Sequence, residues 1–524
     1  MTLRRCGIGG RMKKLPIGIQ SFEKIRTDDF YYVDKTPYVA KLVKEGSGWY
    51  FLSRPRRFGK SLFLDTLRQA FLGKRELFEG LYLENNWDWE KKYPVVYIDF
   101  AEGVIDSKET LVKTIESILR RHAKLCGIVY EEELLNLRFR ELIEKTSLKY
   151  NQKVVILIDE YDKPILDKIE NRELAIEIRE TLKNFYGVLK PLDSYIRFVF
   201  ITGVSKFSKV SLFSGLNQLQ DITLNPEYST ICGYTQKEFE EVFLDRLSGI
   251  DLEGVRCWYN GYSWLGESVY NPFDVLLYLA EKEFRPYWFE TGTPSFLIKV
   301  MLERKYYLPR LSKLNVGEEL IGSFDVEAIT PENLLFQTGY LTIEEKSSEA
   351  GDIRYKLRFP NREVQISFNN YFLDYLVEDY YKKLENKSLL RDAFKGNDFE
   401  KIREIFEGFF SSIPYEWYKR NDLSGYEGYY ASVVYAYFCA SGFEVIVEDA
   451  TSVGRIDMTV IYGDSVYVME FKVVELEGEG KAIKQVKEKR YWEKYMGRGF
   501  NIYIMGVEFS KDKRNIVAFE VEQM

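Results

Sequence analysis

A short run of residues behind the first apolar segment has the side chains needed to bind phosphate. Lys60 could reach the terminal phosphate oxygens and Ser61 could bind Mg²⁺, while backbone N–H groups at a helix start cradle the phosphates. The loop comprises Arg57, Phe58, Gly59, Lys60, Ser61 and Leu62. This is the chemistry of a Walker A loop, which binds ATP, although Arg54 stands where the usual G-x-x-x-x-G-K-[ST] spacing has its first glycine.

Two acidic residues follow a later apolar segment and could complete that site. Asp159 would position Mg²⁺ through water, and Glu160 would be catalytic because it would polarise the attacking water. Thr202 ends another apolar segment, where a polar residue can sense the terminal phosphate. The alternative is that Asp159 only caps the helix that follows a buried strand. The phosphate-binding loop upstream favours an ATP site in which Ser61 and Asp159 hold Mg²⁺.

A second group of side chains, near the C-terminus, could bind a metal ion and act on phosphate. Asp457 lies in one apolar segment, and Glu470 and Lys472 lie in the next, where positions i and i+2 share a strand face. Two carboxylates can hold Mg²⁺ or Mn²⁺, and a lysine can stabilise the phosphate and orient the attacking water. The alternative is a surface ion pair between Glu470 and Lys472. The strongly apolar run Val466–Met469 favours the catalytic site.

Residues on the two flanking helices extend this second pattern. Glu427 precedes it and Gln485 follows it, and the whole arrangement resembles the D…E-x-K signature of the PD-(D/E)XK nucleases, with Ile456 where many members have proline. The resemblance implies that Glu427 and Gln485 assist catalysis and that the substrate is DNA or another nucleic acid. Lysines around Gln485 could contact DNA, or could belong to a solvated helix face, because glutamates alternate with them.

The elements that must position the first site alternate between short apolar runs and longer segments of helical period. The expected strands are Trp49–Ser53, Val95–Phe100, Val154–Ile158 and Phe198–Thr202. The expected helices between them include Ser61–Leu72, Leu111–Leu125 and Leu174–Leu189. Strands that are apolar throughout and separated by helices indicate a parallel sheet covered on both faces, that is, an α/β P-loop NTPase domain of the AAA/ASCE-like kind.

The remainder of the chain divides into a helical region and a second α/β domain. Helices are expected at Gln236–Leu247 and Val275–Glu283, and a small hairpin at Gly339–Glu344 and Ile353–Arg358. The C-terminal part is expected to run helix, three strands, helix and strand, a restriction-endonuclease-like α/β order. The expected elements there are Tyr426–Cys439, Phe443–Glu448, Arg455–Tyr462, Ser465–Val473, Lys481–Tyr495 and Asn501–Gly506. We therefore expect a disordered tail (1–11), an ATPase-like domain (12–235), a mostly helical lid or connector (236–410) and a nuclease-like domain (411–524).

The composition restricts the kinds of site that the chain can build. One histidine, His122, and scattered cysteines make a zinc site or a histidine-based catalytic group improbable and favour a reducing, cytoplasmic setting. His122 lies in a basic helical run and is expected at the surface. A net charge of −7 and an isoelectric point near 5.4 argue against non-specific coating of nucleic acid, and no apolar run is long enough to span a membrane. The aromatic cluster Trp258–Trp264 could stack on bases, but a packed junction is favoured.

Several segments together resemble the bacterial and archaeal family of AAA-ATPase-like proteins fused to a C-terminal PD-(D/E)XK domain. They are Ile17–Glu23, Tyr32–Thr36, Arg54–Ser61, Leu157–Asp162 and Thr202–Ser205. The resemblance covers nearly the whole chain after Met12 and implies that Arg54 belongs to the family's own form of the loop. It implies an ATP-binding and ATP-hydrolysing protein that couples to Mg²⁺-dependent nucleic-acid cleavage and that can form a homo-oligomer. The alternative is a nucleotide-dependent switch or scaffold whose nuclease fold is inactive and only binds DNA or protein.

Overall fold

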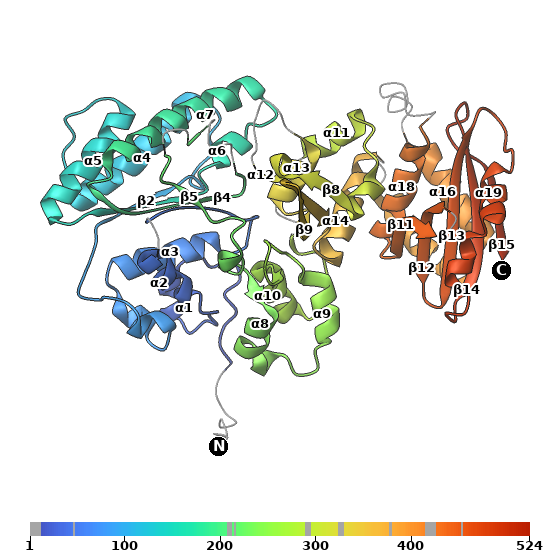
Figure 1. Cartoon of the computed structure of the whole chain (residues 1–524), viewed down its shortest axis with the longest axis horizontal. Helices are drawn as coiled ribbons and strands as arrows, with labels where there is room; N and C mark the ends of the chain where they lie inside the picture. Colours follow the sequence, from blue (N-terminus) through green and yellow to red (C-terminus); the bar gives the residue numbers. More distant parts are fainter. Residues whose placement is uncertain are drawn as a thin grey trace, which may run out of the picture. The chain divides into compact units, whose positions relative to one another are not determined.

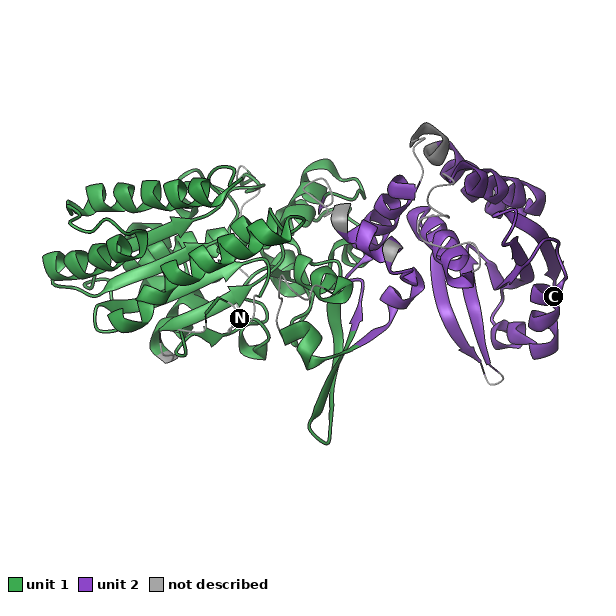
Figure 2. Ribbon diagram, turned by 90° about the horizontal axis from the view of Figure 1, so that it is seen from above, with its two compact units in different colours: residues 1–287, 316–356 green, residues 288–315, 357–524 purple. Residues whose placement is uncertain are grey.

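The computed structural model of the chain divides into two compact units (Figure 2). One unit comprises Met1–Tyr287 with Val316–Lys356, and the other comprises Trp288–Asn315 with Leu357–Met524. The region 236–410, expected as one connector, therefore contributes to both units. The structure describes residues 12–45, 48–206, 212–213, 216–288, 295–322, 330–376, 380–413, 426–451 and 454–524. The expected disordered tail, 1–11, lies outside these ranges.

The first unit is built on a parallel sheet whose strand order is β2-β3-β4-β1-β5 (Figure 1). The strands are β1 (Trp49–Ser53), β2 (Val95–Asp99), β3 (Val154–Asp159), β4 (Ile196–Gly203) and the short β5 (Gln220–Asp221). Every residue of β1 and β3 is buried. Such strands form where helices cover both faces of a sheet. The α/β class and the parallel sheet are confirmed.

Helices lie on both faces of this sheet, with α1–α3 on one side and α4–α7 on the other in Figure 1. Their bounds are α1 (Phe22–Thr27), α2 (Thr36–Glu45), α3 (Lys60–Phe71), α4 (Lys108–Cys126), α5 (Leu135–Tyr150), α6 (Lys163–Leu166) and α7 (Arg172–Tyr186). Each long helix buries an apolar stripe; in α4 it includes Leu111, Ile115 and Leu119. Burial of this stripe against the sheet is the main force that fixes these helices.

The expectation that His122 is a surface residue was wrong. His122 is buried, and its Nε2 lies 2.6 Å from the Tyr97 carbonyl of β2. It follows Ile115 and Ile118 at helical spacings of seven and four residues, so it continues the stripe of α4 that faces the sheet. The basic residues next to His122 in the sequence lie on other faces of the helix, and they suggested that His122 is exposed as well. Burial lowers the pKa of His122, so the neutral ring fits its place in the core.

The remaining part of the first unit contains helices and, within residues 316–356, the larger part of a three-stranded sheet. The helices are α8 (Gln236–Val242), α9 (Leu252–Tyr259), α10 (Pro272–Glu281), α12 (Glu318–Gly322) and α13 (Pro331–Thr338). The strands β6 (Tyr234–Thr235) and β7 (Val269–Tyr270) pair with each other. The strands β8 (Leu314–Gly317), β9 (Thr342–Glu349) and β10 (Asp352–Arg358) lie in the order β8-β10-β9. The region expected to be mostly helical thus contains a sheet, of which only the β9–β10 hairpin was predicted.

The second unit packs helices against a mixed sheet of order β11-β12-β13-β14-β15. Its strands are β11 (Glu444–Thr451), β12 (Gly454–Tyr462), β13 (Ser465–Val474), β14 (Asn501–Ser510) and β15 (Ile516–Gln523). Its helices are α11 (Ser295–Glu303), α14 (Arg362–Leu376), α15 (Tyr380–Gly396), α16 (Phe399–Ser412), α18 (Glu427–Ala440) and α19 (Lys481–Lys489). Only β13 and β14 run parallel; their neighbours pair antiparallel. The expected order of helix, three strands, helix and strand is present.

Two boundaries in the second unit differ from the sequence prediction. The helix expected over Lys481–Tyr495 ends at Lys489, because Arg490 adopts a left-handed conformation with φ of 50° and a 3-10 turn follows. The final strand β15 was not predicted, although it begins with the apolar run Ile516–Phe519; only its second half alternates between charged and apolar residues. No helix in the described ranges is long and apolar enough to cross a membrane.

Candidate nucleotide site and candidate nuclease site

The loop between β1 and α3 has the backbone shape of a phosphate cradle. Arg57 and Gly59 adopt left-handed conformations, with φ of 67° and 92°. Helix α3 begins at Lys60, and Gly59 provides no side-chain cap. The first N–H groups of a helix have no intrahelical acceptor and carry partial positive charge. The start of α3 is therefore suited to an anionic group, with Leu62 in its first turn.

The loop side chains meet the acids that follow β3. The Lys60 ammonium lies 3.3 Å from the Glu160 carboxylate and donates a hydrogen bond of 3.2 Å to the Pro55 carbonyl. The Ser61 hydroxyl forms a hydrogen bond with Asp159. These contacts lie at the carboxyl ends of parallel strands, which is where open α/β sheets bind ligands. The structure thus brings together four of the residues expected at the nucleotide site.

Asp159 is buried among other acids, which suits a bound cation. Burial, together with the nearby charge of Glu160, raises the pKa of Asp159 to about 7. Asp99 ends β2 in register with Asp159, and burial raises its pKa too. A divalent ion would stabilise such neighbouring carboxylates in their charged form. The sequence analysis did not include Asp99 in the site. Its position at the end of a strand parallel to β3 could have placed it there.

The end of β4 is hydrogen-bonded to Asp162, which follows the acids Asp159 and Glu160. Thr202 is fully buried, and its hydroxyl has no hydrogen-bond partner among the described residues. Asp162 accepts hydrogen bonds from the Val204 N–H (3.2 Å), the Ser205 N–H (2.6 Å) and the Ser205 hydroxyl (2.5 Å). A Cβ on Gly203 would lie 2.2 Å from Asp162, so only glycine fits there. Asp162 thus fixes the segment that carries Thr202.

Arg54, which replaces the first glycine of the usual loop, has a structural role. Its guanidinium is buried and donates to the carbonyls of Ser53 (2.8 Å), Thr223 (2.9 Å) and Tyr228 (3.2 Å). It also stacks on the Trp264 ring at 4.2 Å. Three carbonyls and an aromatic face compensate the burial of the charge. Arg54 therefore anchors the start of the loop to the segment after β5.

The aromatic cluster after α9 packs inside the first unit. Tyr262 and Trp264 are buried, and both rings contact Phe58, with centroids 4.7 Å and 5.3 Å away. Trp258 stacks on Phe284 at 5.6 Å. The packing interpretation of this cluster therefore holds for the described side chains, because the rings that hold the phosphate loop are covered. Phe58 supports the loop from behind.

The C-terminal acids and the lysine also form one cluster, on the adjacent strands β12 and β13. Asp457 and Glu470 share a side-chain hydrogen bond, and Asp457 accepts the N–H of Phe471 at 2.9 Å. The Lys472 ammonium lies 3.2 Å from Glu470 and 3.6 Å from Glu427. The structure therefore places the residues of the D…E-x-K pattern and the helix acid together.

Glu470 has the properties expected of a metal ligand. It is 1% exposed, and its Oε2 has no hydrogen-bond partner in the part of the chain that the structure describes. Burial, followed by the charge of Asp457, raises the pKa of Glu470 to about 7. Burial raises the pKa of Asp457 as well. A buried carboxyl group in contact with a half-buried one favours either a shared proton or a cation, so the residues fit a divalent metal ion.

The cluster is smaller than a complete protein-built metal cage. Within the described ranges, no group of three or more His, Cys, Asp or Glu side chains is arranged to hold an ion. Mg²⁺ commonly uses one or two carboxylates and completes its shell with water and substrate phosphate. Asp457 and Glu470 would supply that number of carboxylates.

Helix α19 places Gln485 against the cluster. The Gln485 amide donates a hydrogen bond to Glu470 Oε1. The helix start is held by the buried Glu508 of β14, which accepts the backbone N–H groups of Glu479 (2.5 Å), Gly480 (3.1 Å), Lys481 and Ala482 (3.1 Å). Sequence reasoning missed Glu508, because a single acid inside an apolar strand has no pattern in the sequence.

The basic residues of α19 and the following turn are largely paired with acids. Lys484 lies 3.8 Å from Glu488, and Arg490 lies 2.5 Å from Glu493. Further pairs are Lys481–Glu479, Lys487–Glu522 and Lys494–Asp449. Paired cations attract a phosphate backbone less strongly than free ones. The interpretation as a solvated, ion-paired helix face is therefore favoured over a DNA-binding face.

Fold and site together define a P-loop ATPase-like domain and a nuclease-superfamily domain in one chain. Residues 16–213 match the family model "Predicted AAA-ATPase", and residues 425–519 match "PD-(D/E)XK nuclease superfamily". A protein from Azotobacter chroococcum mcd 1, described as "Uncharacterized protein in vnfD 5'region", is 48% identical over 513 residues, which cover 98% of this chain and 99% of that protein. The chain belongs to this family of AAA-ATPase-like proteins with a C-terminal PD-(D/E)XK domain.

One solved structure adds a distant likeness. The crystal structure of Cdc6p from Pyrobaculum aerophilum is 12% identical, with a TM-score of 0.24, and the match covers 66% of this chain and 92% of that one. The strand order of the sheet and the two family models define the fold of this chain.

Proposed function

We propose that this protein binds and hydrolyses ATP in its first unit and cleaves nucleic acid with Mg²⁺ or Mn²⁺ in its second unit. The observation that carries the cleavage proposal is the contact of the buried Glu470 with the half-buried Asp457 beside Lys472, with one Glu470 oxygen unsatisfied. The free thiols Cys126, Cys232, Cys257 and Cys439 suit a reducing compartment, so we place the activity in the cytoplasm.

The nucleotide chemistry follows from the residues around the phosphate loop. Lys60 would leave Glu160 to bind the terminal phosphate oxygens, and Ser61 and Asp159 would hold Mg²⁺. Bound Mg²⁺ supplies charge neutralisation between the phosphates. Glu160, freed from Lys60, would orient the attacking water, and Thr202 would form a hydrogen bond to the transferred phosphate.

The cleavage chemistry follows from the second cluster. Asp457 and Glu470 would hold the divalent ion, which supplies Lewis-acid stabilisation of the phosphate. Lys472 would orient the attacking water and stabilise the charge that develops on phosphate oxygen. Gln485 fixes the orientation of Glu470 through its amide, and Glu427 fixes Lys472.

Nicking of supercoiled DNA tests the cleavage proposal. We expect the wild-type chain to nick DNA only with Mg²⁺ or Mn²⁺, and Glu470→Ala to be inactive. The matched control is Glu522→Ala, an exposed acid on β15, which should retain activity. Equal nicking by wild type and Glu470→Ala would reject the assignment.

A second candidate function is a nucleotide-dependent switch whose nuclease fold binds DNA or protein without cutting. The ion pairs of the α19 lysines favour it, because they leave few free cations for phosphate contacts. Binding of DNA or protein by a folded chain that cuts no DNA or RNA under any divalent ion would support this alternative.

A further inference from the structure

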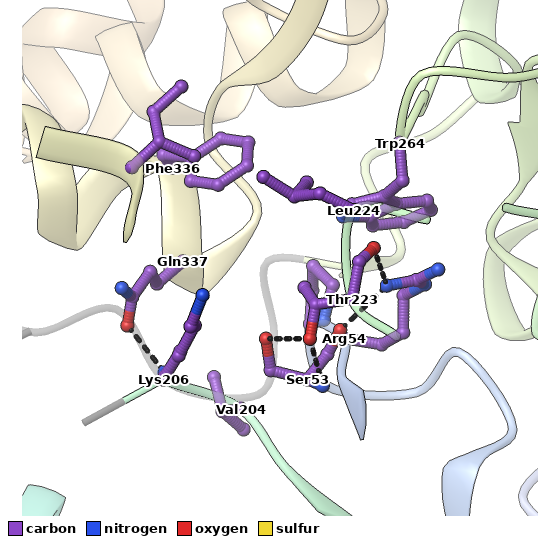
Figure 3. Close-up of a pocket in the computed structure, with 11 residues that line it drawn as sticks. Ser53, Arg54, Val204, Lys206, Thr223, Leu224, Trp264, Phe336 and Gln337 are labelled. Carbon is purple, nitrogen blue, oxygen red and sulfur yellow. Dashed lines mark hydrogen bonds between the residues drawn. The ribbon is translucent and has the colours of Figure 1, made fainter. Parts of the chain in front are cut away.

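A small cavity in the first unit is too small for a further ligand (Figure 3). Its volume is about 20 Å³, and one water molecule needs about 10–15 Å³ by this measure. Its lining, which includes Arg54, Trp264 and Gln337, contains none of the residues expected to bind phosphate or Mg²⁺. A further ligand is therefore to be expected on open surface, where the charges of the second unit are unevenly distributed.

The segment Ser295–Lys313 of the second unit is strongly basic. It contains five basic residues and one acid, a net charge of +4 in a chain whose net charge is −7. The basic residues are Lys299, Arg304, Lys305, Arg310 and Lys313. The segment precedes the nuclease family model of residues 425–519, yet it belongs to the same compact unit. The charge of the whole chain disfavours coating of nucleic acid, but a local concentration of cations is the electrostatic signature of a nucleic-acid contact.

The segment ends in a short 3-10 helix, η7 (Leu308–Ser312), whose apolar side chains are all buried. A 3-10 helix has three residues per turn, so positions i, i+3 and i+6 share a face. The Arg310 N–H donates to the Tyr307 carbonyl at 3.1 Å, and the Lys313 N–H donates to the Arg310 carbonyl at 3.2 Å. Arg310 and Lys313 are exposed, and Tyr307 is half-buried. These three side chains therefore form one face, which we call the η7 face.

The packing of η7 brings it to the nuclease site. The helix contacts α18 and β11, and the Leu308 N–H donates to the hydroxyl of the buried Ser432 at 3.1 Å. Ser432 in turn donates to the Gly428 carbonyl at 2.6 Å. The next residue towards the N-terminus is Glu427, whose carboxylate lies 3.6 Å from the Lys472 ammonium. The first turns of α18 thus connect η7 to the acid that pairs with the site lysine.

Tyr307 lies within electrostatic range of the site carboxylates. Burial raises the pKa of Tyr307, and the charges of Asp457, Glu448 and Glu427 raise it further. The Tyr307 phenol forms no hydrogen bond with the described residues. A protonated phenol is a hydrogen-bond donor, so this O–H is available to an oxygen of a substrate phosphate.

The cations of the η7 face differ from those of α19. Neither Arg310 nor Lys313 forms an ion pair within the described ranges, whereas Lys484 and Lys487 pair with acids. Binding of a free cation to phosphate releases a condensed counterion, but a paired cation must first lose its acid partner. The η7 face is therefore the stronger phosphate-binding surface beside the nuclease site.

We propose that the η7 face, made of Tyr307, Arg310 and Lys313, binds the phosphate backbone of nucleic acid beside the nuclease site. This inference rests on the proposed nuclease function and names the surface that holds its substrate. Arg310 and Lys313 bind phosphates next to the one that is cleaved, and Tyr307 donates its O–H to a phosphate oxygen near Asp457. A segment outside the nuclease family model thus completes the substrate site.

The salt dependence of binding tests the η7 face apart from cleavage. The full chain is titrated into a fluorescently labelled DNA duplex in EDTA at several NaCl concentrations, and anisotropy gives the affinity; a labelled RNA hairpin is the second probe. We expect the double variant Arg310→Gln, Lys313→Gln to bind about tenfold more weakly or worse, with a slope of log affinity against log salt that is shallower by about 2 on duplex DNA.

The matched control removes two paired cations, Lys484→Gln with Lys487→Gln, and so changes the net charge by the same amount. Its slope should differ from that of wild type by less than about 0.5, because these lysines contribute few phosphate contacts. Equal effects of the two double variants would overturn the inference, since charge at any position would then suffice.

The substitution Tyr307→Phe tests the phenol separately from the cations. It keeps the ring and removes the O–H, so we expect about threefold weaker binding or worse and an unchanged salt slope. The control is Tyr503→Phe, whose ring packs on Phe399 of α16 at 5.2 Å and which should bind like wild type. Wild-type affinity in Tyr307→Phe overturns the role of Tyr307.

Binding and nicking distinguish this inference from the proposed cleavage. A chain that nicks DNA with Mg²⁺, while the Arg310 and Lys313 variant binds like wild type, overturns the η7 face alone. A chain that binds through the η7 face and cuts neither DNA nor RNA rejects the cleavage alone. Wild type that binds neither probe at low salt overturns the η7 face, and nicking then decides the cleavage. The probe whose binding the double variant loses identifies the nucleic acid that the surface holds.

Discussion

At the scale of single residues, each candidate site contains one buried carboxylate beside a second, half-buried one. Asp159 lies beside Glu160, and Asp457 lies in contact with Glu470. Burial raises the pKa of Asp159 and of Glu470 to about 7. Buried acids of this kind are uncommon unless a proton, a metal ion or a cationic side chain compensates them. The same physical arrangement therefore appears twice, in two unrelated folds.

For the nucleotide site, we predict that Lys60→Ala weakens ATP binding by about tenfold or more, because a desolvated, charge-assisted phosphate contact is lost. Glu160→Gln should retain ATP binding and lose hydrolysis, since it removes the group that orients water. Calorimetry measures the first effect and phosphate release the second. Unchanged ATP affinity in Lys60→Ala would contradict the assignment.

For the second site, the raised pKa of Glu470 predicts a pH dependence of stability. The unfolded glutamate has a pKa of 4.5, while the folded one has a pKa of about 7, so the folded chain binds this proton more tightly. The chain should therefore lose up to roughly 3 kcal/mol of stability as the pH rises from about 4.5 to about 7. Mg²⁺ should restore stability above that range, because it replaces the proton.

Calorimetric unfolding with and without Mg²⁺ measures this dependence. The variant Glu470→Gln has nearly the same shape and no titratable group, so the pH slope of its unfolding should be smaller than that of wild type, and the part that Asp159 contributes should remain. A slope as steep as that of wild type would assign the effect to another group.

At the scale of elements, helix α19 is positioned by one acid. Glu508 accepts four backbone N–H groups at the start of this helix. We predict that Glu508→Ala destabilises the chain by about 3 kcal/mol or more, because several buried donors lose their acceptor. The same change should displace Gln485 from Glu470 and impair the nuclease site. Urea unfolding measures the loss; Glu522→Ala, which removes only an exposed ion pair, should cost less than about 1 kcal/mol.

The contacts of helix α18 indicate which residues the nuclease-like domain needs in order to fold. The helix is buried on nearly all sides, and its Tyr437 and Phe438 contact Phe406 of α16. A fragment that begins near residue 414 would lack α14–α16 and expose this surface. We predict that residues 414–524 alone aggregate, while 288–524, which include the whole second unit, fold with a cooperative transition. Circular dichroism and size-exclusion chromatography compare the two. A soluble, folded fragment 414–524 would show that α14–α16 are dispensable.

At the scale of the whole molecule, each candidate site is complete within one unit. The residues Asp457, Glu470 and Lys472 all belong to the second unit, and Lys60, Asp159 and Glu160 to the first. We therefore predict that DNA cleavage requires Mg²⁺ or Mn²⁺ but no ATP at the bond-breaking step. Single-turnover cleavage by Lys60→Ala should match wild type once DNA is bound. Slower bond cleavage by Lys60→Ala would mean that the cleavage step itself depends on the nucleotide site.

The sequence alone determined the class of each domain and predicted most residues of each candidate site. Near-continuous apolar runs followed by polar residues predicted the parallel strands and the site at their carboxyl ends, since burial on both faces leaves this signature. The spacing of Asp457, Glu470 and Lys472 predicted one shared face, because strand side chains alternate. These patterns are local, because they depend only on residues that lie near one another in the sequence.

Only the tertiary structure decided the features that depend on contacts between distant segments. The burial of His122, the helix cap by Glu508 and the contact of Gln337 with Lys206 each join residues far apart in the sequence. The role of Arg54 became clear only when its carbonyl partners and Trp264 were in place. Only the burial of His122 has a signal in the sequence, its helical spacing from Ile115 and Ile118. The polar contacts leave no such pattern, because the free energy of one buried polar contact depends on the partner that the fold supplies.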